Sequence, residues 1–180
     1  MPPRHAVFVS FHHANDQSYR NIFTTRFSSR FDLCVDKSVD IGDIDPNLQA
    51  ETIRRKIRDE YLRTSSVTVV LIGIETWQRK HVDWEIAASL RDTQFNPRSG
   101  LLGILLPSYR ARHGKPDPHT LPPRLADNLP NRFATLHDWS DDPELVSGWI
   151  HDAYLRKGRI LPDNARPLFG RNWSGDRWTL

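Results

Sequence analysis

The sequence has very little sulphur and no long apolar run. Its 180 residues include one cysteine, Cys34, and one methionine. A single cysteine excludes an internal disulfide and fits a reducing cytosol, so we expect a cytoplasmic location and a buried, unreactive Cys34 in a strand. No apolar run is long enough to cross a membrane, and the N-terminus leads directly into a strand without a signal peptide. We therefore expect no membrane as a partner.

Neither sign of charge prevails. The chain has 25 lysines and arginines against 22 acidic residues, with 38% hydrophobic and 26% charged residues, which is typical of a globular domain with a core of its own. The densest basic cluster is Arg54, Arg55, Lys56 and Arg58. It falls in an expected helix, and we interpret it as a solvated face. We therefore do not expect nucleic acid as a partner.

Several motifs of α/β proteins are absent from the sequence. No Gly-x-Gly-x-x-Gly follows the first strand, no Gly-rich phosphate loop ends in Lys-Ser or Lys-Thr, and no Gly-x-Ser-x-Gly elbow occurs. The first strand also ends in Ser10-Phe11-His12 rather than in the acids of a receiver domain. These absences argue against a Rossmann dinucleotide site, a phosphate-loop NTPase, an α/β-hydrolase and a response regulator.

Short apolar runs alternate with helical periodicity along the chain. Continuous β-branched runs predict strands buried on both faces, and such an alternation predicts a parallel sheet with right-handed crossovers. The expected fold is therefore α/β, a flavodoxin-like sandwich with a five-stranded parallel sheet in the order 2-1-3-4-5. We expect Asn15 or Asp16 to cap the first helix and Pro46 to begin the second. The expected strands are residues 6–11, 31–35, 67–72, 100–106 and 133–136, and the expected helices are residues 17–28, 46–62, 77–90 and 142–153.

Two proline-rich segments do not fit this alternation. Residues 107–130 hold six of the thirteen prolines and lack periodicity, so we expect an irregular insertion that is a lid, a partner-binding element or inert. Residues 158–180 form a tail whose Trp173 and Trp178 either pack back on the body or engage another chain. We therefore expect one domain over residues 1–157, which includes the insertion, and a C-terminal tail.

Residues 67–90 contain the candidate functional group, Glu85. A strand ends at Gly73, and helical periodicity then places Trp77, His81 and Glu85 on one stripe. Glu85 lies beside the stripe that faces the sheet, so we expect it to be half buried at the carboxyl edge, where open α/β sheets bind ligands. In the alternative interpretation, Glu85 is a helix-flank residue that forms a salt bridge or meets water.

Two groups of residues carry the side chains of metal ligands. Residues 36–47 hold four aspartates, but their order does not match an EF-hand and no glutamate closes the loop. His12, His13 and His81 can meet at the sheet edge, although separate hydrogen-bonding histidines are the simpler interpretation. We expect no metal site.

One carboxylate at a sheet edge is enough for one class of reaction. It can hold ribose hydroxyls and stabilise an oxocarbenium-like transition state. Cleavage of an N-glycosidic bond with a good leaving group, such as the nicotinamide of NAD, needs little more. Phe11, Trp77 and Trp84 can stack on the leaving base or on the adenine.

Three segments resemble one known family. They are Val-Phe-Val-Ser-Phe-His-His at 7–13, Thr-Ser-Ser-Val-Thr-Val-Val-Leu-Ile-Gly at 64–73, and Thr-Trp-Gln-Arg-Lys-His-Val-Asp-Trp-Glu-Ile at 76–86. They are similar to the TIR-like proteins of the Thoeris antiphage system, the ThsB family. The resemblance covers roughly residues 5–106 and implies a TIR-type three-layer sandwich.

The resemblance also implies an activity. Glu85 would be the catalytic residue of an enzyme of the NAD glycohydrolase or ADP-ribosyl cyclase type, with NAD as substrate and no cofactor. The product would be a cyclic or conjugated ADP-ribose signal that activates a partner effector protein in antiphage defence.

By the same resemblance, the first strand, the third strand–helix unit and a loop that covers the site in TIR domains supply the substrate-binding residues. His81 departs from the family, which usually has tryptophan four residues before the glutamate. That difference bears on the packing around Glu85. The implied substrate-binding residues are Ser10, Phe11, His12, Asp43, Asp45, Trp77, His81 and Trp84.

Two other functions fit the same residues. One is a non-enzymatic TIR-like module that assembles through its helices and loops, and a blocked pocket would favour it. The other is a nucleoside deoxyribosyltransferase-like enzyme, which also uses a carboxylate on an α/β sheet and would turn over deoxynucleosides but not NAD. Self-association is a further expectation, because many TIR domains complete their site only when stacked.

Overall fold

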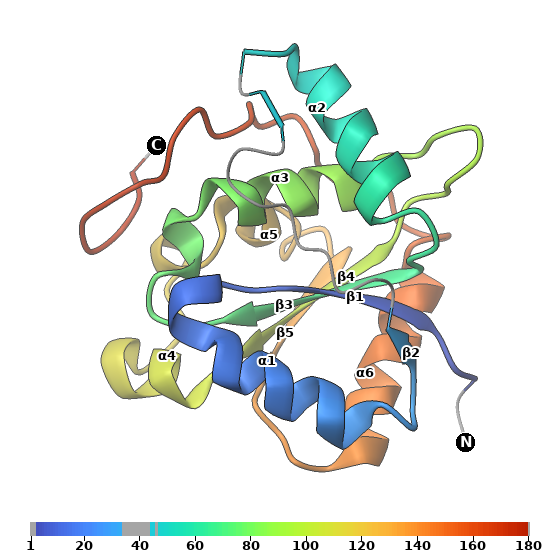
Figure 1. Ribbon diagram of the computed structural model, residues 1–180. Helices are drawn as coiled ribbons and strands as arrows, with labels where there is room; N and C mark the ends of the chain where they lie inside the picture. Colours follow the sequence, from blue (N-terminus) through green and yellow to red (C-terminus); the bar gives the residue numbers. More distant parts are fainter. Residues whose placement is uncertain (1–2, 34–43, 46, 180) are drawn as a thin grey trace.

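A computed structural model describes residues 3–33, 44–45 and 47–179, and its centre is a parallel sheet (Figure 1). Four strands form the body of the sheet, and the two-residue β2 pairs with β1 at one edge. The order is β2-β1-β3-β4-β5 with every pair parallel, which confirms the expected order. The strands are β1 (Ala6–Ser10), β2 (Asp32–Leu33), β3 (Val67–Ile72), β4 (Gly100–Leu105) and β5 (Ala134–Asp138).

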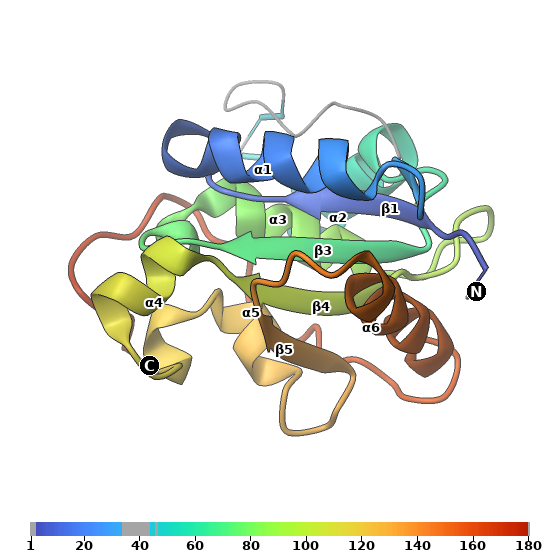
Figure 2. The same ribbon diagram turned by 90° about the horizontal axis from the view of Figure 1, so that it is seen from below.

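The apolar runs become the inner strands because helices cover both faces of the sheet. Every residue of β3 and β4 is buried, as their continuous runs predict. On one face lie α1 (His13–Phe27) and α6 (Pro143–Arg156), and on the other lie α2 (Ala50–Lys56), α3 (Lys80–Ser89) and α5 (Pro123–Asp127) (Figure 1). Figure 2 shows β1, β3, β4 and β5 side by side with α6 in front of them. The expected α/β architecture is confirmed.

The helix starts differ from two of the expectations. Helix α1 begins at His13 directly after β1, with His12 in the N-cap position, so neither Asn15 nor Asp16 is the cap. The second helix begins at Ala50 rather than at Pro46 and continues as a π-helical turn over Ile57–Tyr61. The start of α6 is as expected, because the Asp142 carboxylate accepts the backbone N–H of Glu144 and Leu145. Cys34 and the end of the expected second strand lie outside the described residues.

Arg58 corrects the interpretation of the basic cluster. It lies in the π-helical turn and is 1% exposed, so it does not belong to a solvated face. Its guanidinium donates to the hydroxyls of Ser65 and Ser99 at 3.1 and 3.0 Å and to the carbonyl of Pro97. Ser65 lies seven residues along the chain, whereas Pro97 and Ser99 come from a distant loop, and together these acceptors compensate the burial of the charge. Arg55, in contrast, is exposed.

The proline-rich segment 107–130 is not irregular throughout. It contains α4 (Pro107–His113), a 3₁₀ turn at Pro118–Thr120 and α5, and both helices begin with proline, which suits a first helical position. Tyr109 and Leu125 are fully buried against β4 and α3. Periodicity did not reveal these helices because each is only seven or five residues long. None of the helices in the described ranges is long and apolar enough to span a bilayer.

The C-terminal segment packs back on the body beside α3 and α5 (Figure 1). Trp178 is 5% exposed, and its indole N–H donates to the Leu121 carbonyl at 3.0 Å. Trp173 stays 37% exposed, while its backbone N–H donates to the Gln78 carbonyl at 2.8 Å. Of the two expected roles of this tail, packing on the body is the one observed.

Candidate functional site

The candidate site lies where β1 and β3 end side by side. Ser10, the last residue of β1, pairs with Val70, two residues before the end of β3. After β1 the chain enters α1 on one face, and after β3 it enters a 3₁₀ turn (Thr76–Gln78) and α3 on the other face. Chains that leave neighbouring strands toward opposite faces open a crevice at the carboxyl edge of the sheet.

Glu85 faces this edge from the middle of α3 and is completely buried, with 0% of its surface exposed. The Ser10 hydroxyl, also 0% exposed, donates to Glu85 Oε2 at 2.5 Å. The expectation of a half-buried Glu85 is therefore wrong. Helix α3 directs the Glu85 side chain inward toward β1, where the hydroxyl of Ser10 donates a hydrogen bond to its carboxylate.

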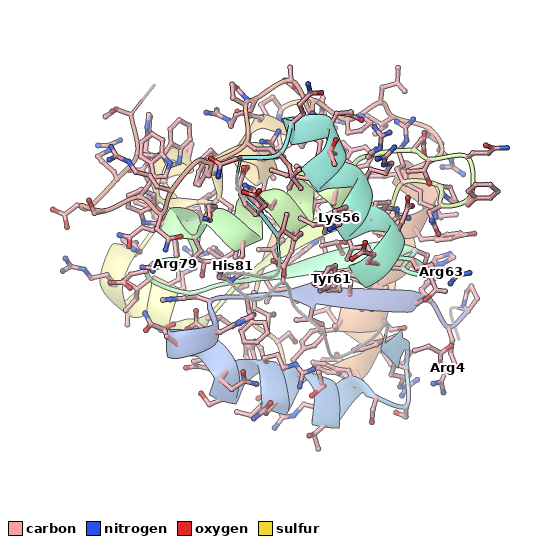
Figure 3. The ribbon with its side chains drawn as sticks, turned by 45° about the horizontal axis from the view of Figure 1, so that its top comes forward. Arg4, Lys56, Tyr61, Arg63, Arg79 and His81 are labelled. Carbon is pink, nitrogen blue, oxygen red and sulfur yellow. The ribbon has the colours of Figure 1, made fainter. Side chains whose placement is uncertain are left out.

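Histidines surround the start of α1 and α3. Figure 3 shows His81 beside Arg79 at the end of α3 that lies over the carboxyl end of β1. A ring nitrogen of His81, Nε2, lies 3.1 Å from the Phe11 carbonyl oxygen, and the His81 ring packs 4.8 Å from the ring of His13. No group of three histidine, cysteine or acidic residues in the described part of the chain is arranged to hold a metal.

Burial sets the protonation of these histidines. His12 and His81 are each 5% exposed, and desolvation lowers the pKa of each to about 4, with nearby Arg79 acting in the same direction. The Phe11 carbonyl partly opposes the shift in the pKa of His81. Both imidazoles are therefore neutral at pH 7 and add no positive charge to the site.

Asp16, which the sequence predicts as a possible helix cap, is instead a buried acid at this edge of the sheet. It is 3% exposed, and desolvation raises its pKa to about 6, while a hydrogen bond from the Thr76 hydroxyl partly offsets the rise. Gly73 makes room for it, since a Cβ there would lie 2.2 Å from an oxygen of the Asp16 carboxylate. Its position in the first helical turn after a strand was the sequence feature that could have indicated a buried acid at this edge.

The aromatic residues occupy different places. Phe11 is 4% exposed and packs in the core between α1 and α6, and Trp77 is 1% exposed. Trp84 is 4% exposed and packs with Phe8 and Ile53, between α3, β1 and α2. Its indole N–H donates to the Phe169 carbonyl of the tail at 2.9 Å. Trp84 thus neighbours Glu85 in sequence but not on the same side of α3.

The two aspartates expected in the covering loop are placed differently. Asp43 lies outside the described residues. Asp45 is exposed, and its carboxylate accepts the backbone and side-chain N–H groups of Asn47, which forms a turn before α2. The structure therefore brings together Ser10, His12, His81, Glu85 and the backbone carbonyl of Phe11, whereas the Phe11 ring packs in the core and Trp84 and Asp45 lie elsewhere.

A second buried acid of α3 was missed from the sequence. Asp83 and Arg124 form an ion pair of 2.9 Å with side chains 2% and 0% exposed. Burial raises the pKa of Asp83, and the guanidinium of Arg124 opposes that rise. The partners are 41 residues apart in sequence, on α3 and α5, so no local spacing predicts the pair.

The comparison with known families agrees with this geometry. A scan against protein-family models matches residues 8–111 to the family described as Thoeris protein ThsB, TIR-like domain. The match covers more than half of the chain, includes Ser10 and Glu85, and ends before the tail. A search of the curated proteins finds no match. The resemblance inferred from the sequence is confirmed, and the chain belongs to the ThsB TIR-like family of Thoeris antiphage defence.

Proposed function

We propose that this protein cleaves the nicotinamide N-glycosidic bond of NAD and produces an ADP-ribose signal, with Glu85 as the catalytic carboxylate on a flavodoxin-like, five-stranded TIR-type fold. The observation that carries the proposal is the contact between Glu85 and Ser10 at the carboxyl edge of β1. A buried carboxylate at this place is the group that an oxocarbenium-forming reaction requires.

The surroundings of Glu85 suit the charge that develops in such a reaction. When the bond to nicotinamide breaks, positive charge appears on the ribose, and nicotinamide leaves as a neutral base. At this edge of the sheet burial keeps His12 and His81 neutral, and a carboxylate there favours that charge more than it would among protonated histidines. Ser10 positions the carboxylate through its hydroxyl.

The acceptor of the ribosyl cation determines the product. Water gives ADP-ribose, a hydroxyl of the same molecule gives a cyclic product, and an external nucleophile gives a conjugate. In each case the acceptor loses one proton. In the proposed role, the product then activates an effector protein of the defence system. The ThsB family assignment supports this role in signalling.

The full burial of Glu85 favours one alternative, the non-enzymatic interaction module. Glu85 and Ser10 are both 0% exposed, so a substrate reaches the carboxylate only after neighbouring side chains move. A module without activity needs no such movement. If the site opens for substrate, the protein should release nicotinamide from NAD. If the site stays closed, it should release none.

The test is mass spectrometry of NAD incubated with the wild type and with Glu85→Gln, at low and high protein concentration and with extract from phage-infected cells. We expect nicotinamide release by the wild type and its loss in Glu85→Gln. The matched control is Glu75→Gln, because Glu75 lies at the same edge but its side chain is 42% exposed and pairs with Arg79. The mass of the co-product distinguishes hydrolysis, cyclisation and transfer. No release under any of these conditions would support the interaction module.

A further inference from the structure

The tail, residues 158–179, is held to the body by the buried ion pair of α3 and α5. Besides binding Asp83, the Arg124 guanidinium donates to the carbonyls of Arg166 and Pro167 at 2.8 and 3.1 Å. Asp83 in turn accepts the backbone N–H of Phe169 at 2.9 Å. Both ends of the ion pair therefore bind tail backbone, and this fixes the path of residues 166–169 beside α3.

The next tail residues follow α3 toward its N-terminus. The Phe169 carbonyl accepts the indole N–H of Trp84, the residue before Glu85, at 2.9 Å. The Trp173 N–H donates to the carbonyl of Gln78, in the turn that precedes α3, at 2.8 Å. The tail thus runs along the helix that carries the proposed catalytic residue.

Tail residues 166–174 line a cavity of about 810 Å³, within the range of about 300–1,000 Å³ that is usual for small-molecule sites. The described lining includes arginine and aromatic residues and no acidic residue. Arg166 is already held by Asp127 through two hydrogen bonds of 2.7 and 2.8 Å. Arg171, in contrast, forms no ion pair with any other described residue. The cavity therefore presents a guanidinium that is open to an anion.

An aromatic face lies beside this charge. Trp173 is 37% exposed, and its ring centre is 5.5 Å from that of Phe169 at an angle of 41°. A partly exposed indole stacks well on a purine, and a guanidinium forms paired hydrogen bonds with phosphate oxygens. Together these groups match an adenine nucleotide.

We propose that the tail cavity binds the adenosine 5′-phosphate half of the dinucleotide, with Arg171 on the phosphate and Trp173 against the adenine. The inference rests on the proposed function, because a scissile bond at Glu85 places nicotinamide near Ser10. The other half of the dinucleotide must then extend along that edge, and the tail reaches it at the start of α3, where the Trp173 N–H donates to the Gln78 carbonyl and the Asn172 side chain accepts the N–H of Lys80. These binding residues lie outside the stretch that matches the family, residues 8–111.

The test measures binding of AMP and of nicotinamide mononucleotide separately, by calorimetry on the full chain. Arg171→Ala and Trp173→Ala should each weaken AMP at least about tenfold and leave nicotinamide mononucleotide unchanged. Trp173→Phe keeps an aromatic face and should restore AMP binding. The control is Arg177→Ala, which removes one positive charge from the same tail but from an exposed pair with Asp117 outside the cavity. Melting temperatures check that each variant is folded.

Unchanged AMP binding in folded Arg171→Ala and Trp173→Ala would overturn the proposal. Equal weakening of both mononucleotides, or the same loss in Arg177→Ala, would also overturn it, because the effect would then be one of general charge. AMP binding needs no cleavage, so the test is independent of turnover. If AMP binds as expected while the wild type releases no nicotinamide from NAD, the binding site stands and the proposed function fails.

Discussion

Two acids of α3, two residues apart, are both buried but have different neighbours. Asp83 is bound by the guanidinium of Arg124, which sits across the α3–α5 contact, and by a backbone N–H of the tail. Glu85 points to the opposite side of the helix and accepts the hydroxyl of Ser10 at the end of β1. The first carboxylate is part of an ion pair that holds two helices and the tail together, whereas the second lies at the edge of the sheet where ligands bind.

The difference shows how a fold separates a structural acid from the acid that we propose as catalytic. An arginine compensates the charge of Asp83 in place, so that carboxylate is not available to a substrate. A hydroxyl positions Glu85 without adding positive charge. We therefore expect changes at Asp83 to alter stability and changes at Glu85 to alter chemistry.

The largest expected effect on stability comes from Asp83→Asn. Removal of one partner leaves the Arg124 charge buried and unpaired, which destabilises proteins by about 3–5 kcal/mol. Urea unfolding followed by circular dichroism measures the change. Asp92→Asn is the matched control, because Asp92 pairs with Arg98 at the surface, where its side chain is 47% exposed. We expect that control to change stability by less than about 1 kcal/mol. Equal effects of the two substitutions would contradict a structural role of Asp83.

The buried histidines His12 and His81 should make the protein sensitive to acid. Because the folded pKa of His12 and His81 is about 4 and the unfolded value is 6.5, the unfolded chain binds more protons between these values. Stability should therefore be full above pH 6.5 and fall by about 3 kcal/mol per histidine as the pH decreases to 4. Urea unfolding at pH 4 to 8 measures this slope, and it should be shallower in His12→Gln and His81→Gln. Parallel curves for the wild type and both variants would contradict the assignment.

Asp16 should act in the opposite direction over part of the same range. Its folded pKa of about 6 lies above the ordinary value of 3.8, so its contribution to stability falls as the pH rises between these two values. The effect of Asp16→Asn on the free energy of unfolding should therefore be more favourable at pH 7 than at pH 4, by up to about 3 kcal/mol. The same unfolding series detects it. A variant that loses as much stability at pH 7 as at pH 4 would show that Asp16 is not a strained buried acid.

The smallest effect is expected for Ser10→Ala. The substitution removes one hydroxyl that positions Glu85 and leaves the carboxylate in place. We expect nicotinamide release from NAD to fall about tenfold, which corresponds to one hydrogen bond, with little change in melting temperature. Ser10→Thr keeps the hydroxyl and should retain more activity than the alanine variant. An equal loss in both variants would point to packing rather than to hydrogen bonding.

The strands of the sheet and some of the helix starts could be predicted from the sequence. The apolar run of β3 and the aspartate cap of α6 gave their positions because both depend on adjacent residues. The burial of Glu85 and of Arg58 was underestimated, since each is compensated by a serine hydroxyl from a distant segment, Ser10 for Glu85 and Ser99 for Arg58. The pair of Asp83 and Arg124 lay beyond sequence reasoning for the same reason.

Within the candidate site, the placement of Trp84 and Glu85 on different sides of α3 was also not predictable. Trp77, His81 and Glu85 share a stripe in sequence, and Trp84 lies beside it. Only the path of the tail shows that Trp84 binds Phe169 rather than the sheet edge. That path depends on contacts between segments more than eighty residues apart, which composition and periodicity do not encode.

The most direct test compares Glu85→Gln with Asp83→Asn in one experiment. Nicotinamide release is measured by mass spectrometry at saturating NAD, with extract from infected cells, and the melting temperature is recorded on the same samples. We expect Glu85→Gln to release nicotinamide about a thousandfold more slowly than the wild type at an unchanged melting temperature. We expect Asp83→Asn to melt at a markedly lower temperature but, while folded, to release nicotinamide within about tenfold of the wild-type rate. Normal release by Glu85→Gln, or the same loss in both variants, would contradict a catalytic role of Glu85 that is separate from the structural role of Asp83.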